Sequence, residues 1–580
     1  MGVLLQAAYR RSKGVSVPSP VDGDNSVPWW WDRLASQAKS LRLSGFSGIL
    51  LPPVLKTSAG ASTGADGYGT FDDYDLGSKN QFSVPTRFGT REQLQRCVAV
   101  LRANGLDVYV DAVLHQRDGG NDGVYEYLAA DGITRNGRFP KRHGCFVGDP
   151  AQGYIWRDPL PGPVQDDFAF GDELAPINAV PKNYVRDGLI EAGDWLTRSL
   201  GVQGYRVDDV KGLAVSFVHD WLTSKAMVNK FAAGEYYDGN PSTLNWWVWQ
   251  SGMSGRSCAF DFALHFVLRS MCNSGSRWDM AQLDHAGLAG ISPMQAVTFV
   301  DNPDTDTDPS TSVIWNKILG YAYILTSEGY PCVYYKDYST DPGCYGLKPF
   351  IDNLIWIHEN LAFGSTIQRW KDFQCFVFER QGYPNLLVGM NNDMYSGWRT
   401  VRVQTNFGPY TELHDYTGRA GNVWTDWSGA VTIGIPPNDN GFGYVCYSRN
   451  GYGQAFSAIP LQTQQAFEGA ADLDIGPAVN GTPVQAGRIW CEAGSGVEAV
   501  LSAETSSWSA QASITVELVD GDGSVLAAGH QAAGAHDATI QAIARRPGWL
   551  TARVQGVGLP PVGAPFTLTM TYTAPQEIFL

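Results

Sequence analysis

The sequence predicts a mixed α/β protein built on a closed (β/α)₈ barrel and followed by two antiparallel β-sandwich domains. Three observations support this fold class. Short apolar runs alternate with helix-like segments up to about residue 361, polar residues follow several of these runs, and the pattern then changes to strands and turns. The 580 residues also exceed one core of ordinary size, so we expect several domains.

Eight apolar runs predict the barrel, and they occupy residues 2–8, 45–53, 105–114, 201–209, 230–238, 258–265, 296–302 and 329–335. Segments with helical periodicity, such as 29–44 and 91–105, lie between them. Apolar strands that alternate with helices are typical of a parallel sheet covered on both faces, and eight of them favour closure into a barrel. We assign residues 1–114 and 181–361 to this barrel.

Three further segments complete the predicted organisation. Residues 115–180 are rich in Gly, Asp and Pro and too long for an ordinary loop, so we interpret them as an excursion domain after the third strand. Residues 362–452 alternate strands with turns, which predicts a β-sandwich. Residues 461–580 repeat this character, with a hairpin signal in ITVELVDGDGSVLAAG, and predict a second sandwich that is either structural or carbohydrate-binding.

Composition and charge narrow the classes of function. The net charge of −16 argues against a nucleic-acid partner, because phosphate binding needs a basic footprint. The sequence contains no run of about 18 apolar residues, so we predict no membrane span. The N-terminus lacks the pattern of a signal peptide, so the sequence as written predicts a cytoplasmic protein, or a secreted one if a leader was removed. Nine cysteines without a Cys-x-x-Cys pair suggest no zinc site, and we expect a monomer.

Carboxylates and an arginine lie where apolar runs end, which is where the working residues of such a barrel are found. Asp111, Asp208, Glu235 and Asp304 follow four of the runs, and Arg206 precedes Asp208 by two residues, so both point the same way. Each carboxylate alone would suit a helix cap. Together they suit glycosidic cleavage, in which one carboxyl is the acid and the other the nucleophile or the base.

The motifs around these residues resemble those of the alpha-amylase family of retaining glycoside hydrolases, over about residues 1–450. They look closest to the bacterial liquefying-type amylases. GYRVDDVKG resembles the nucleophile motif, GEYYDG the acid/base motif and FVDNPDT the motif of the third carboxylate. DVYVDAVLHQ and GYGTFDDYDLGSKNQ also fit. The resemblance implies hydrolysis of α-1,4-linked glucans such as starch, glycogen or maltooligosaccharides.

The resemblance also implies roles for individual residues. Asp208 would be the nucleophile, Glu235 the general acid and base, and Asp304 would hold hydroxyls of the distorted sugar. Arg206 would orient Asp208, and Asp111 would support the site electrostatically.

Further residues are predicted to contact the substrate. By the resemblance, Phe71 would stack on a sugar ring and Lys211 would reach the leaving-group side. From their positions after Glu235, Tyr236, Tyr237 and Trp247 are also expected to line the substrate path.

Four departures from the family pattern concern one sugar subsite and the calcium site. Pro303 and Gln116 stand where sugar-binding histidines are expected; proline has no donor to offer, whereas glutamine can still hydrogen-bond. His115 replaces a calcium-binding asparagine, and Asn178 replaces an acidic ligand, although Ca²⁺ prefers oxygen ligands. Calcium is thus expected from the family, but at a site that looks degraded, and we assign no metal ligand.

Three interpretations remain open. The chain is a glucan hydrolase with weaker binding of the reacting sugar, where one lost hydrogen bond costs about 1–3 kcal/mol. Alternatively, the subsite is reshaped for a modified or different α-glycan, or for transfer to a sugar acceptor. Finally, the barrel is a glucan-binding protein without activity, an interpretation disfavoured by the retained carboxylates and Arg206.

Overall fold

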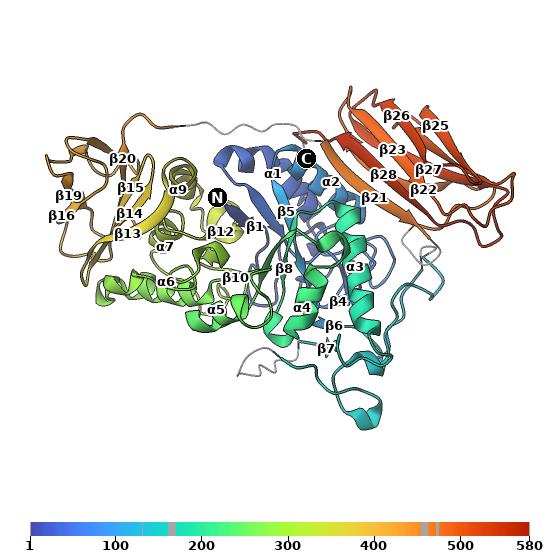
Figure 1. Cartoon of the computed structure of the whole chain (residues 1–580), viewed down its shortest axis with the longest axis horizontal. Coiled ribbons are helices and arrows are strands. Elements are labelled where there is room, and N and C mark those ends of the chain that lie inside the picture. Colours follow the sequence, from blue (N-terminus) through green and yellow to red (C-terminus); the bar gives the residue numbers. More distant parts are fainter. Residues whose placement is uncertain (1, 130–131, 161–169, 454–461, 471–474, 579–580) are drawn as a thin grey trace.

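Eight parallel strands close a barrel at the centre of the molecule (Figure 1). The structure is a computed structural model that describes residues 2–129, 132–160, 170–453, 462–470 and 475–578. Around the barrel the order is β1 (Leu4–Gln6), β12 (Tyr330–Tyr334), β11 (Ala296–Phe299), β10 (Cys258–Phe260), β9 (Phe231–Gly234), β8 (Gly204–Val207), β5 (Asp107–Ala112) and β2 (Gly48–Leu51). Each predicted apolar run contains one of these strands, so the predicted barrel is confirmed.

Helices cover the outside of the barrel, and apolar side chains fill its interior. The helices are α1 (Trp30–Ser44), α2 (Arg91–Ala103), α3 (Tyr184–Leu200), α4 (Val215–Leu222), α5 (Pro241–Trp249), α6 (Phe262–Ser274), α7 (Lys317–Ile324), α8 (Tyr335–Tyr338) and α9 (Lys348–Leu361). Helix α2 shows how the sequence sets a boundary: Thr90 and Gln93 form a reciprocal capping box at its first turn. Inside the barrel, Leu4, Leu50, Phe260 and Val297 belong to one buried cluster.

Short elements in the connections shape the mouth of the barrel. After β2 comes the hairpin of β3 (Lys56–Thr57) and β4 (Thr70–Asp72). After β5, the predicted excursion contains β6 (Gln116–Arg117) paired with β7 (Asp172–Glu173); its residues 130–131 and 161–169 lie outside the described residues. Single 3₁₀ turns occupy η1 (Pro20–Asp22), η2 (His143–Cys145), η3 (Pro150–Gln152), η4 (Val210–Gly212), η5 (Lys225–Met227), η6 (Gly275–Arg277), η7 (Met280–Leu283) and η8 (Pro293–Gln295).

The excursion is tied to the barrel side by buried charges. The Asp73 carboxylate, which follows β4, pairs with Arg117 of β6 and accepts a 2.6 Å hydrogen bond from Lys141. The Arg117 and Lys141 pairing holds the pKa of Asp73 below its usual range despite complete burial. The loops that wall the cavity are therefore rigidly connected at their bases.

A first β domain follows α9. Its six-stranded sheet runs β13 (Phe363–Lys371), β14 (Cys375–Gly382), β15 (Leu386–Asn391), β20 (Tyr444–Arg449), β17 (Glu412–Asp415) and β18 (Val423–Trp424). A second sheet pairs β16 (Arg399–Gln404) with β19 (Ala430–Ile435). Val377, Leu387, Val401 and Ile433 join the two sheets in one buried cluster, as expected of a sandwich.

A second sandwich lies on the opposite side of the barrel (Figure 1). One sheet is β21 (Gln462–Gly469), β28 (Phe566–Thr573), β23 (Gly496–Ser502) and β26 (Ala538–Ile543), and the other is β22 (Val484–Cys491), β27 (Gly548–Val557), β24 (Ser513–Val519) and β25 (Val525–Ala532). The predicted first residue of this domain, 461, lies outside the described residues. In the part of the chain that is described, no helix is both long and apolar enough to span a bilayer.

The second sandwich is docked onto helices α2 and α3. Arg198 of α3 forms a 2.6 Å ion pair with Glu468 of β21, and Ala99 and Ala103 of α2 join the apolar core of the sandwich. Trp490 packs edge-on against Trp549, and the Arg96 guanidinium of α2 lies 5.1 Å from the Trp490 ring centre. These two tryptophans are therefore occupied by contacts within the chain.

Candidate active site

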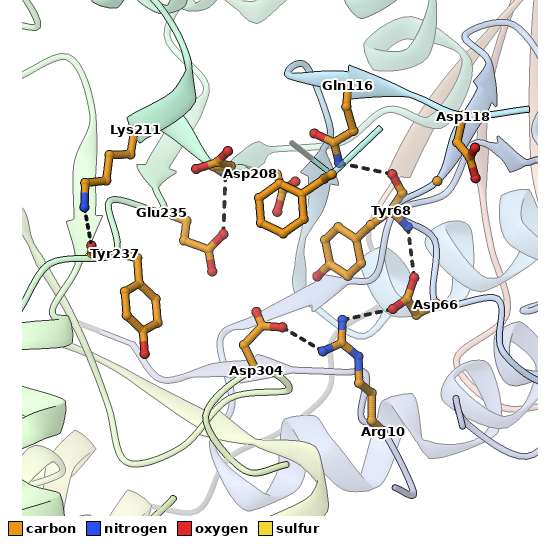
Figure 2. A pocket seen from close by; sticks show the side chains of 13 residues that line it. Arg10, Asp66, Tyr68, Gln116, Asp118, Asp208, Lys211, Glu235, Tyr237 and Asp304 are labelled. Carbon is orange, nitrogen blue, oxygen red and sulfur yellow. Dashed lines mark hydrogen bonds and ion pairs between the residues drawn. The ribbon is translucent and has the colours of Figure 1, made fainter. Parts of the chain in front are cut away.

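A cavity of about 580 Å³ opens at the carboxyl ends of β8, β9 and β11. Most of the side chains around it are polar, and six of them are carboxylates (Figure 2). The lining residues are Arg10, Asp66, Tyr68, Gly69, Gln116, Asp118, Phe170, Asp208, Asp209, Lys211, Glu235, Tyr237 and Asp304. The structure thus brings Asp208, Glu235 and Asp304, predicted separately from three strand ends, to one cavity.

Arg206 connects the carboxylates at the base of the cavity. Its Nη1 donates to both oxygens of Asp111 at 2.6 Å and to Oδ1 of Asp208 at 2.8 Å, while its Nη2 lies 2.5 Å from Oε1 of Glu235. The barrel explains this convergence, because the parallel register of β5 and β8 places Asp111 beside Arg206. Asp208 follows two residues later on the same face.

Burial raises the pKa of each carboxyl in this group. Asp208 and Glu235 both reach about 7, and Asp111 reaches about 6. In each case desolvation is the largest cause, Arg206 opposes it, and a neighbouring carboxylate adds to it. Since one guanidinium cannot compensate three buried negative charges, the group retains protons near neutral pH, and its titration belongs to the set rather than to one residue.

Asp304 lies in a turn after β11 that is held from below. The side-chain Oδ1 of Asn302 accepts hydrogen bonds from the Asp304 N–H at 2.9 Å and the Thr305 N–H at 2.8 Å. Asp301 pairs with Lys317 and Asp306 pairs with Lys336, both in buried contacts. The two aspartates that flank Asp304 are thus buried anchors of the turn, whereas the Asp304 side chain is 38 % exposed.

Gln116 and Lys211 also reach the cavity, and both make contacts within the chain. The Gln116 amide donates to the Tyr68 carbonyl at 3.2 Å, and its oxygen lies 3.1 Å from Nδ1 of His115. Lys211 donates to the Tyr237 carbonyl at 3.3 Å (Figure 2). Both side chains therefore have a fixed place in the wall.

Three predicted substrate contacts are not at the cavity. Phe71 is 7 % exposed and packs against other aromatic rings of the excursion, with Tyr127 5.1 Å away between ring centres. Tyr236 and Trp247 are buried at 1 % and 0 % exposure and pack on each other in the core. None of the three lines the cavity. Their physical setting is that of core residues.

Two other tyrosines, Tyr68 and Tyr237, do line the cavity. Tyr68, three residues before Phe71, lines the cavity and donates from its hydroxyl to Oδ2 of Asp111 at 2.8 Å. Tyr237, which follows Tyr236, also lines the cavity.

Arg10 and Asp66 are cavity residues that sequence reasoning missed. Arg10 lies in the loop after β1, and its guanidinium donates to Oδ1 of Asp304 at 2.8 Å and to Oδ2 of Asp66 at 2.9 Å (Figure 2). Arg10 stands beside Arg11 in a run of polar residues, and nothing in the sequence separates the two. Only the fold shows which one faces the cavity.

His115 and Asn178, the two residues expected near calcium, have different polar partners. Burial lowers the pKa of His115 to about 4, so its ring is neutral. Asn178 instead accompanies Asp158, whose Oδ1 accepts the Asn178 N–H at 2.8 Å. Among the residues that the structure describes, no three His, Cys, Asp or Glu side chains are grouped so that they could hold a metal ion.

Comparison with known proteins shows which family the chain is similar to. It is 29 % identical over 477 residues to glucan 1,4-alpha-maltohexaosidase from Bacillus sp. (strain 707), a match that covers 73 % of this chain and 88 % of the relative. It is 28 % identical to alpha-amylase from Geobacillus stearothermophilus, over 71 % of this chain and 81 % of that one. Residues 386–448 match the family model described as Alpha-amylase C-terminal. Over this length the chain is similar to alpha-amylases. The resemblance read from the motifs is thereby confirmed.

Solved structures of the family share the fold. Alpha-amylase from Geobacillus thermoleovorans, complexed with acarbose, superposes with a TM-score of 0.52 at 16 % identity, over 78 % of this chain and 98 % of that one. Alpha-amylase I from Eisenia fetida, in a complex with maltohexaose, gives 0.54 at 16 % identity, over 72 % and 95 %. At this identity the likeness concerns the fold alone.

Proposed function

We propose that the protein is a retaining glycoside hydrolase that cleaves α-1,4 linkages in glucans of the starch and maltooligosaccharide type. The observation that carries the proposal is the shared contact of Asp208 and Glu235 with one guanidinium at the base of one cavity. Two carboxyls held side by side at a sugar-sized cleft are what double displacement requires. The similarity to a glucan 1,4-alpha-maltohexaosidase and to an alpha-amylase agrees with this substrate class.

In the proposed first step, an Asp208 oxygen attacks the anomeric carbon while Glu235 gives its proton to the leaving glycosidic oxygen. The C–O bond of the glycoside breaks and an ester to Asp208 forms. In the second step Glu235 takes a proton from water, which attacks the same carbon and releases Asp208. The raised pKa of Glu235 suits a group that must begin protonated near neutral pH.

The other cavity residues would support these steps. Asp304, partly exposed and held by its turn, would accept hydrogen bonds from sugar hydroxyls. Arg206 would keep Asp208 ionised and oriented through its 2.8 Å contact. Tyr68 would offer its ring as a stacking face for the reacting sugar, the role that Phe71 cannot fill from the core.

A reshaped cleavage subsite is the second candidate, and the contacts of Gln116 favour it. One of its two amide N–H groups serves Tyr68, its oxygen lies beside His115, and Pro303 offers no donor, so the two positions present at most one donor where two histidines would present two. A sugar with an altered hydroxyl pattern would not need these donors. Release of reducing ends from a panel of starch, glycogen, dextran and modified α-glucans separates the candidates: starch-type glucans as the best substrates support the first, and a preference for another glycan supports the second.

An inactive glucan-binding protein is tested by the same assay. The proposed chemistry predicts that turnover by the wild type is abolished in Asp208→Asn. Binding of maltohexaose without release of any product by the wild type would overturn the proposed hydrolase.

We also propose that the chain does without the calcium ion of its family. In support, the Arg157 guanidinium lies 2.6 Å from Oε2 of Glu173, close to His115 and Gly212. The space left between these residues is about 10 Å³, close to the volume that one water needs. A cation with six to eight oxygen ligands does not fit beside a neutral imidazole and a guanidinium, so Arg157 supplies the positive charge there.

A further inference from the structure

We infer that Arg10 is a positioning and sugar-recognition residue of this site, which takes over from the two absent histidines by fixing Asp304 and closing the adjoining wall with Asp66. The inference rests on the proposed function and adds a residue to it. It explains how a chain with Pro303 beside Asp304 can still orient that carboxylate.

The geometry of the bridge carries the inference. Arg10 uses Nη1 for Asp304 and Nη2 for Asp66, at 2.8 and 2.9 Å, so both arms of one planar fork are engaged (Figure 2). All three residues line the cavity. They come from the connections after β11, β1 and β2, and the bridge therefore ties three loops of the barrel mouth together. Charge-assisted contacts of this kind fix direction as well as distance.

The loop that carries Arg10 is itself held in place. Tyr9 stacks on Tyr335 with ring centres 5.8 Å apart, and the indole of Trp30 donates to the Ala7 carbonyl at 2.8 Å. On the other side, the Ser16 N–H donates to the Thr63 carbonyl at 3.1 Å. With both sides anchored, Arg10 is presented to the cavity at little further cost in entropy.

Among the residues that the structure describes, Arg10 is the cationic donor on the wall beside Asp304. Pro303 has no N–H and no polar side chain, and one of the two N–H groups of the uncharged Gln116 amide already serves Tyr68. Arg10 has a side chain that is 23 % exposed, so it borders the space that a sugar would enter. Lys211, the other cation that lines the cavity, lies on the side of Tyr237, away from Asp304 (Figure 2). Arg10 thus supplies the positive charge on the Asp304 side.

The test compares Arg10→Ala and Arg10→Lys with a matched control, Arg11→Ala. Arg11 is the next residue of the same loop but pairs with Asp22 and lies outside the cavity. On maltohexaose we expect Arg10→Ala to lower kcat/KM about 100-fold, mostly through kcat, because Asp304 acts on the distorted sugar. Arg10→Lys should retain part of the rate, since an ammonium can reach one carboxylate but cannot bridge two. Arg11→Ala should match the wild type.

Chemical rescue separates positioning from a merely structural role. Millimolar guanidinium chloride should restore part of the rate of Arg10→Ala, while urea at the same concentration, which has the shape without the charge, should not. The inference is overturned if Arg10→Ala and Arg11→Ala have the same kcat/KM. A loss that guanidinium does not rescue, together with a matching fall in Tm, would also overturn it.

Failure of the inference and failure of the proposed function give different results. If the wild type releases no product, the proposed function fails, and Arg10 is then tested through calorimetric binding of maltohexaose. Weaker binding by Arg10→Ala at unchanged Tm supports its role in recognition, and equal affinity overturns it.

Discussion

Two guanidiniums hold carboxylates of one cavity and differ in almost every other respect. Arg206 is 3 % exposed and contacts three carboxylates, whereas Arg10 is 23 % exposed and bridges two. Arg206 stands on a barrel strand in a family motif, and Arg10 stands on a loop without one. On the proposed function, the residues that would form and break bonds are thus held by the rigid barrel. Those that would recognise the sugar stand on loops, where a chain can change.

The difference also sets the electrostatics of each side. Around Arg206, burial and crowding raise the pKa of Asp111, Asp208 and Glu235. Around Arg10, two carboxylates share one cation at a partly solvated wall, where screening weakens each charge. We therefore expect substitutions on the Arg206 side to have the larger effects.

The largest loss of activity is expected from Arg206→Lys. A small loss would contradict the difference between Arg206 and Arg10. A lysine keeps the charge but loses the planar fork that holds Asp111, Asp208 and Glu235 at once. We expect kcat/KM on maltohexaose to fall about 1,000-fold, within the range for loss of a preorganised donor. Arg10→Lys, measured in the same assay, should lose less. Equal losses would mean that the two guanidiniums do comparable work.

A second effect concerns stability and follows from the raised pKa of Glu235. Its carboxyl has a value of about 4.5 when unfolded and about 7 when folded. The group therefore favours the fold below about pH 4.5, and this contribution is lost as the pH rises through about 7. Replacing the ionised carboxylate by a neutral amide removes the cost of burying its charge.

Thermal unfolding checks the sign. Near pH 8 we expect Glu235→Gln to have a Tm higher than the wild type by about 2–4 °C, the shift that corresponds to roughly 1 kcal/mol in a large domain. Near pH 4 the two proteins should unfold together. If Glu235→Gln is instead less stable than the wild type near pH 8, then burial of the ionised Glu235 carboxylate does not destabilise the fold.

The smallest change in stability is expected when calcium is chelated. This prediction concerns a third guanidinium, that of Arg157. Because Arg157 already neutralises Glu173, we expect EDTA and added calcium to leave the Tm of the wild type unchanged. Arg157→Ala leaves Glu173 without this partner and should lower the Tm by a few degrees. A wild type that loses stability in EDTA and regains it with calcium would contradict the proposed absence of the ion.

Much of the catalytic side could be predicted from the sequence, because it depends on strand ends. Asp208, Glu235 and Arg206 each follow from a short apolar run and the alternation of a strand, and the barrel register brings them together. The sequence does not distinguish Tyr237, which lines the cavity, from Tyr236, which faces the core, because both follow the end of β9. Trp247 lies on α5, whose inner face packs on the barrel, and its position after Glu235 does not reveal this.

Less of the recognition side could be predicted, because it depends on where loops meet. Arg10 and Asp304 are 294 residues apart in sequence, and only the closed barrel brings the loop after β1 close to the loop after β11. Phe71 and Tyr68 are both aromatic residues of one motif, and the packing of the excursion decides which of them faces the cavity. The positions of Pro303 and Gln116 showed where donors are missing, but not what replaces them.

The most direct test of the account is to trap the glycosyl-enzyme. In Glu235→Gln, an activated donor such as α-maltotriosyl fluoride needs no acid for the first step, but the second step lacks its base. We predict that mass spectrometry finds one maltotriosyl group on the peptide that carries Asp208, and none in a variant that also contains Asp208→Asn. Fluoride release without this adduct, or an adduct on another residue, would contradict the assignment of Asp208 as the nucleophile.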